Sequence, residues 1–153
     1  MDQRIANRVT TLRLALENDP MGMVSGKLCP GDSSVSLPSQ FRALEECLHC
    51  LNGGRIGVID LWSAEDLPSN QFYLEHAGLA SDRYLVFGQL LYEPLIVDAE
   101  SGCVFMLQDE ALEALEGANS IEEFLSLALS EDYARFVPDP ESDRWIEFLK
   151  RQE

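Results

Sequence analysis

Two cysteines and a histidine stand together in the one C-x-x-C of the chain, Cys47-Leu-His-Cys50. Thiolates and an imidazole at this spacing can bind zinc or carry out redox chemistry. A structural zinc site needs a second pair of ligands, however, and the other cysteines and His76 stand far apart along the sequence. Cys47 also falls among leucines at helical spacing, which is typical of a small core residue. We therefore expect no metal, no cofactor and no catalytic residue, with a small metal-binding protein or enzyme that uses Cys47, His49 and Cys50 as one alternative.

Carboxylates are the most frequent reactive groups, and they could bind Ca²⁺ or act as general acid and base. No EF-hand loop is present, and no nucleophile motif accompanies the histidines. The 27 acidic residues outnumber the 11 basic ones, which gives a formal net charge of −16. This charge disfavours nucleic acids and anionic membranes as partners, because both bind basic surfaces. It favours a basic protein partner, because opposite charge speeds encounter and fixes orientation.

The acids expected on loops and strand ends are the candidate contact residues for such a partner. They are Asp60, Glu65, Asp66, Glu75, Asp98, Glu100, Asp109 and Glu110. The aromatic residues Trp62, Phe72, Tyr73 and Tyr92 flank some of these acids. Aromatic side chains often anchor protein interfaces, although core packing is the ordinary explanation for each of them.

The 153 residues correspond to one domain (1–153), and 46% hydrophobic residues are enough to form a core. The first thirteen residues alternate charged with apolar side chains and lack the apolar run of a signal peptide. No window approaches the length of a membrane span. We therefore expect a cytoplasmic protein with reduced thiols.

The predicted elements divide the domain into three parts. Residues 1–36 contain an amphipathic helix at 3–17 and a loop with a short strand at 23–24. Residues 37–130 form the core motif region, and residues 131–153 form a C-terminal helical part that begins after a proline.

The segment 37–60 is predicted to organise the core region. Pro38 suits the first turn of a helix, and apolar residues recur at spacings of three and four as far as Leu51. The residues at 52–54, Asn-Gly-Gly, are expected to end this helix and turn the chain. A strand at 55–61 should follow.

The later elements are predicted from apolar runs and helix-start signals. They are a short helix at 70–80, strands at 84–87, 90–98 and 103–107, a helix at 109–117 favoured by residue propensity, a helix that starts at the capping box of Ser120 and Glu123, and a last helix after Pro138. We therefore predict an α+β domain with a mainly antiparallel sheet of about four to six strands, flanked by N-terminal and C-terminal helices.

Several of these stretches, taken in order, resemble the SUKH superfamily, which includes many bacterial immunity proteins of polymorphic toxin systems and fungal cell-wall regulators. The resemblance spans residues 37–130 and is carried by Leu37-Pro38-Ser39-Gln40-Phe41 with Leu44 and Leu48, by Asn52-Gly53-Gly54, by Tyr84-Leu85-Val86-Phe87-Gly88, by Leu95-Ile96-Val97-Asp98 with Ser101-Gly102-Cys103-Val104-Phe105, and by Ser120-Ile121-Glu122-Glu123-Phe124-Leu125. The chain departs from the family pattern at 89–94, where members often carry an acidic, Gly-rich loop.

The resemblance implies a SUKH-like α+β protein without catalytic residues, which binds a cognate toxin in the cytoplasm of the producing cell and blocks it. Together with the net charge of −16, it predicts an immunity-type binding protein that neutralises a basic toxin domain, such as a nuclease, through an acidic surface. A regulatory or scaffold module of the same fold, with a partner that is not a toxin, is the alternative.

Overall fold

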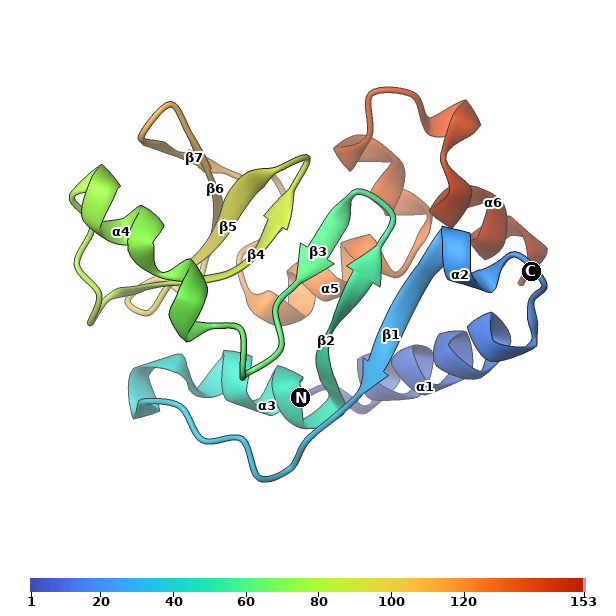
Figure 1. The fold of residues 1–153 in the computed structure, drawn as a ribbon, viewed down its shortest axis with the longest axis horizontal. Coiled ribbons are helices and arrows are strands. Elements are labelled where there is room, and N and C mark those ends of the chain that lie inside the picture. Colours follow the sequence, from blue (N-terminus) through green and yellow to red (C-terminus); the bar gives the residue numbers. More distant parts are fainter. Residues whose placement is uncertain (153) are drawn as a thin grey trace.

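The computed structural model of the chain describes residues 1–152, in which helices at both ends flank a sheet (Figure 1). The helices are α1 (Gln3–Asn18), α2 (Gly22–Ser25), α3 (Arg42–Cys50), α4 (Phe72–Ala77), α5 (Ile121–Ala128) and α6 (Arg144–Arg151), with 3₁₀ turns η1 (Ser39–Phe41), η2 (Pro68–Asn70), η3 (Glu131–Phe136) and η4 (Pro140–Ser142). The strands are β1 (Gly26–Pro30), β2 (Leu51–Ile56), β3 (Ile59–Leu61), β4 (Tyr84–Leu90), β5 (Glu93–Asp98), β6 (Val104–Gln108) and β7 (Ala111–Ala114). Within residues 1–152, no helix combines the length and the apolar character that crossing a membrane requires.

The strands form one antiparallel meander in the order β1 to β7, so each strand pairs with the next along the chain. This confirms the predicted α+β class, the antiparallel sheet and the helices at both ends. The predicted number of strands is wrong, because the described chain has seven rather than about four to six. The extra strands come from three places where local sequence signals point elsewhere.

The first of these places is β1. The short strand predicted at 23–24 is wrong, because Met23 and Val24 lie in α2. This helix ends where the N–H of Gly26 donates to the carbonyl of Gly22. From Gly26 onward the backbone is extended, and buried Leu28 follows exposed Lys27 in the alternation of an edge strand.

The second place is the Asn-Gly-Gly segment, which was predicted to turn the chain but lies inside β2. Helix α3 ends instead because Leu51 takes an extended conformation with φ −142°. Gly54 is required inside the strand, because a Cβ there would collide with the backbone oxygen of Lys27. The turn lies at Gly57 (φ 59°), which divides the strand predicted at 55–61 into β2 and β3.

The third place is 109–117, where the predicted helix is wrong and a β6–β7 hairpin is found. Local propensity favours a helix here, but Leu112 pairs with Leu107 across the hairpin and packs on the sheet. Tertiary burial of this pair outweighs the small differences in helix propensity.

Two groups of apolar side chains hold the sheet between helices. The larger core lies beneath the face covered by α1, α3, α5 and α6, and Trp145, Tyr133, Phe124 and Phe148 are its largest fully buried members. A smaller cluster on the other face places α4 over β4, β5 and β6, through Leu74, Val86, Ile96 and Leu107 (Figure 1).

The predicted capping box of α5 is confirmed. The N–H of Glu123 donates to the Ser120 hydroxyl over 3.0 Å, and the Glu123 carboxylate accepts from the N–H of Asn119 over 2.9 Å. The predicted last helix is also present, and it begins at Arg144 after an N-cap aspartate, Asp143.

The meander places alternate turns at the same end of the sheet. The turns after β2, β4 and β6 therefore share one end, and the N–H of Leu91 donates to the carbonyl of Val58 over 3.1 Å to join the first two. The turn between β5 and β6 lies at the opposite end. This alternation decides which of the candidate acids can lie together.

Candidate functional site

A shallow groove of about 210 Å³ lies where α4 meets the β4–β5 and β6–β7 turns. Its lining comes from all three elements and consists of Tyr73, His76, Ala77, Tyr92, Glu93, Pro94, Leu107, Asp109 and Glu110. We call this the tip groove. It brings Asp109 and Glu110, two of the acids predicted from the sequence, beside exposed aromatic residues.

The tip groove depends on how α4 is held on the sheet. Buried Leu74 anchors the helix, and Gly78 ends it in the left-handed conformation with φ 69°. The side-chain amide of Gln71 donates to the carbonyl of Val86 over 2.7 Å and accepts from its N–H over 3.0 Å. Because β3 pairs with β4 only from Gly88 onward, Gln71 replaces the missing strand partner and fixes α4.

Exposed aromatic side chains surround the tip groove. Phe72 is half-exposed and stacks on Tyr73 with 4.1 Å between ring centroids, while His76 meets Phe72 edge-on at 6.2 Å. Tyr92 is 86% exposed at the neighbouring turn, beside Leu91, which is 40% exposed. Exposed aromatic residues beside polar ones are typical of protein interaction surfaces.

Both turns that form the tip groove have an unusual backbone. Leu91 and Tyr92 have φ values of 50° and 72°, and Asp109 and Glu110 have values of 50° and 64°. A two-residue hairpin turn with two positive φ angles favours Asn, Asp or Gly, so Asp109 suits its position, whereas Leu91, Tyr92 and Glu110 are strained. Bulky residues held in such a conformation indicate a function for the side chains that they display.

Negative charge accumulates around the tip groove. Glu93, Asp109 and Glu110 line it, and Glu75 is exposed on α4. No arginine or lysine is among the lining residues, and none of these four carboxylates forms an ion pair with another residue of the described chain. These acids are therefore available to the cations of a partner.

The structure places the other predicted acids elsewhere. Asp60 is half-buried on β3 and accepts a hydrogen bond from Gln89 over 2.7 Å. Glu65 and Asp66 are exposed on the segment between β3 and η2, where Asp66 accepts from the Ser63 hydroxyl over 3.1 Å. The predicted acids therefore do not form one continuous surface.

Asp98 and Glu100 lie at the opposite end of the sheet from the tip groove. The Asp98 side chain is 4% exposed, so it is not available as a surface contact. The Arg83 guanidinium donates to both carboxylate oxygens of Asp98 over 3.0 Å, and this lowers the pKa of Asp98 to about 2. The Glu100 N–H and the Ser101 hydroxyl also donate to this carboxylate and lower its pKa further. Exposed Glu100 also pairs with Arg83, at 3.2 Å. Asp98 therefore stabilises the turn between β5 and β6.

The C-x-x-C segment lies on α3, as the leucine spacing predicts. The Cys47 thiol is buried in the main core, and this burial raises its pKa to about 12. Cys50 is half-buried, and the Nε2 atom of His49 lies 2.8 Å from the carbonyl oxygen of Val35. Within residues 1–152, no three histidine, cysteine, aspartate or glutamate side chains are grouped as metal ligands would be.

Sequence reasoning missed the contribution of Glu93 and His76 to this groove. The segment 90–98 reads as one apolar strand, but the structure divides it at a two-residue turn. The usual Asn-Gly signal for that turn is absent, since Leu91 and Tyr92 occupy its positions. The only sequence signal for this turn is the polar character of Tyr92 and Glu93, which interrupt an otherwise apolar run.

No known family model matches the chain, and no curated protein matches it.

Proposed function

We propose that this chain is a SUKH-like immunity protein, which binds a basic toxin domain in the cytoplasm and neutralises it by occupying its surface. The observation that carries the proposal is the tip groove, where exposed aromatic side chains and unpaired carboxylates meet without an arginine or lysine in the lining. The resemblance of residues 37–130 to the family supports the same assignment.

The tip groove has the composition of a binding hot spot. An aromatic anchor such as Tyr92 supplies contact area at low conformational cost, and surrounding polar groups exclude water around it. The carboxylates of Glu75, Glu93, Asp109 and Glu110 would pair with arginines and lysines of the partner. A nuclease domain is a suitable partner, because the surface that binds a nucleic acid must itself be basic.

The net charge of −16 would act before contact is made. Long-range attraction raises the rate of encounter with a basic protein and falls steeply with ionic strength. The neutralising complex would therefore form fastest at low salt, and the aromatic contacts would limit its dissociation.

The test is a binding titration against the product of the neighbouring gene, which the proposal requires to contain a basic toxin domain. Glu110→Lys should weaken binding by about 2 kcal/mol or more, which is about thirtyfold, because a partner cation then faces a like charge. Glu65→Lys is the matched control, since it changes the net charge equally at an exposed acid outside the tip groove.

Three results would refute the proposal. These results are failure of the neighbouring gene product to co-purify with the chain, equal weakening of binding by the two charge reversals, and an affinity that is independent of salt. The first result would show that the neighbouring gene product is not the partner. The second would show that the tip groove is not the binding surface, and the third would show that charge does not contribute to binding.

A further inference from the structure

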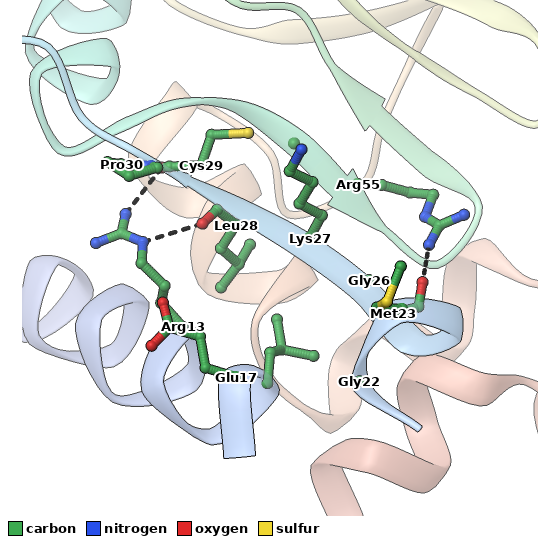
Figure 2. Close-up of a pocket in the computed structure, with 12 residues that line it drawn as sticks. Arg13, Glu17, Gly22, Met23, Gly26, Lys27, Leu28, Cys29, Pro30 and Arg55 are labelled. Carbon is green, nitrogen blue, oxygen red and sulfur yellow. Dashed lines mark hydrogen bonds between the residues drawn. The ribbon is translucent and has the colours of Figure 1, made fainter. Parts of the chain in front are cut away.

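A larger cavity of about 570 Å³ lies beside the edge strand β1, between the C-terminal half of α1 and α2 (Figure 2). The leucines at 16 and 28 and the side chain of Met23 supply apolar lining, while Arg13, Lys27 and Arg55 supply positive charge. Its volume is in the range of small-molecule sites. We call it the β1 cavity.

Positive charge is concentrated in the β1 cavity although the whole chain is acidic. Three of the 11 basic residues of the chain line it, and Glu17 is the one acid among its lining residues. Lys27 and Arg55 are directly opposite one another on β1 and β2. Like charges at such positions repel, so this pair is a local cost to the fold.

The two cations have no acidic partner in the described chain that would offset this cost. Asp60 is the cross-strand neighbour of Arg55 on β3, but its carboxylate accepts from Gln89 instead. The Arg55 guanidinium donates to the carbonyl of Met23 at the mouth of the cavity, as Figure 2 shows. It therefore lies where an anion in the cavity could reach it.

The edge of a sheet often accepts an added strand, but part of the β1 backbone is already occupied. The Arg13 guanidinium donates to the carbonyl of Leu28 over 3.0 Å and to that of Cys29 over 2.9 Å (Figure 2). The N–H of Gly26 already donates within α2. These bonds occupy three backbone groups of β1, so the cavity fits a compact ligand better than an extended peptide.

We propose that the β1 cavity binds a small organic anion, namely a carboxylate with an apolar body. Its hydrocarbon part lies against the exposed Met23 side chain, and its carboxylate pairs with Lys27 and Arg55. Met23 is 90% exposed in the unliganded chain, and a ligand body would cover it. The site is separate from the tip groove and does not depend on the proposed immunity function.

The test uses octanoate as the probe, titrated into the full chain by calorimetry, with amide chemical shifts to locate it. We expect saturable binding, with the shifts of Met23, Lys27 and Arg55 changing most. Octan-1-ol has the same apolar body without the charge, and acetate has the charge without the body. Both should bind about tenfold more weakly or worse, because each lacks one half of the interaction.

Variants separate the two halves of the site. Lys27→Gln with Arg55→Gln should lower the affinity about tenfold or more, because a hydrogen bond to a charged group contributes at least that much. Met23→Glu alters an exposed side chain and should also abolish binding without unfolding the chain. Arg144→Gln removes an exposed base outside the cavity and should have no effect.

The proposal is overturned if the Kd of octanoate is above about 1 mM, which corresponds to a binding free energy weaker than about 4 kcal/mol. It is overturned equally if octan-1-ol binds as well as octanoate, or if the double variant keeps its affinity. Shifts confined to the tip groove would place the ligand elsewhere and would also refute it.

Discussion

Tyr92 is the residue at which fold and proposed function make opposite demands. Its side chain is 86% exposed, so it contributes little to the core, and its φ of 72° is strained for a residue with a Cβ. Two substitutions separate these properties. Tyr92→Ala removes the aromatic ring and keeps the strain, whereas Tyr92→Gly removes both.

The expected difference in stability follows from the backbone. A Cβ in the left-handed region costs about 1–2 kcal/mol, and glycine avoids this cost. Glycine also gives the unfolded chain more freedom, which takes back about 0.4–1 kcal/mol. Tyr92→Gly should therefore be more stable than Tyr92→Ala by about 0.5–1 kcal/mol, or about 1–4 °C in melting temperature for a chain of this size.

The assay is paired thermal and urea unfolding of both variants, together with binding to the toxin domain that we propose as the partner. Binding should fall by about 2 kcal/mol or more in both, which is about thirtyfold, because both lose the anchor ring. Glu113, exposed on β7 with an extended backbone, provides the control. There glycine should be less stable than alanine by about 0.5–1 kcal/mol.

Two results would contradict this reasoning. Equal stability of the alanine and glycine variants at 92 would show that the turn is not strained. Full binding by both variants would show that Tyr92 is no anchor, and the tip groove would then lose its main aromatic contact.

Two further predictions concern buried groups. Because Arg83 lowers the pKa of Asp98 to about 2 from 3.8, the ionised carboxylate stabilises the fold by about 2 kcal/mol above pH 5, and this is lost as the pH falls through 4 towards 2. Asp98→Asn should flatten this acid limb of a stability profile, and Arg83→Met should cost about 2–3 kcal/mol because it leaves a buried charge unpaired. A profile unchanged by Asp98→Asn would contradict the assignment. Since burial raises the pKa of Cys47 to about 12, its thiol should resist iodoacetamide at pH 8 in the folded chain and react once urea unfolds it, as mass spectrometry of the labelled peptide would show. Labelling of native Cys47 as fast as exposed thiols would refute this.

The sequence predicts elements well where local and tertiary preferences agree. The stripe of α1 and the capping box at Ser120 each combine a local signal with a buried apolar face. The class of the fold follows from their order, because strands without long intervening helices form an antiparallel sheet.

Local signals give wrong predictions where contacts with other segments of the fold determine the backbone conformation. The two glycines at 53 and 54 resemble a helix stop, but close approach of β1 explains at least Gly54. The segment 109–117 has helical propensity, but Leu112 pairs with buried Leu107 and is itself partly buried. The role of Gly54 depends on a strand that is distant in sequence, and the pairing of Leu107 with Leu112 depends on the register of a hairpin that local propensity does not favour.

The candidate site shows the same limit. Charge alone predicts an acidic surface but cannot decide which acids share it. Asp98 is buried by Arg83, which lies 15 positions away, and the meander places it at the far end from Asp109. Only the alternation of turns assigns Asp109 and Glu110 to the same groove as Tyr92.

The three turns at that end provide an internal comparison. At the β2–β3 turn the left-handed position is occupied by Gly57, where a Cβ would collide with the Tyr133 hydroxyl, and Tyr133 accepts from the N–H of Val58 over 2.9 Å. That turn packs against the protein itself and uses the residue that its backbone prefers. The two turns of the tip groove face solvent, and glycine would fit their backbone with less strain. They nevertheless carry Leu-Tyr and Asp-Glu. The chain thus places large and charged side chains where they weaken the fold, and recognition of a partner is a physical reason for doing so.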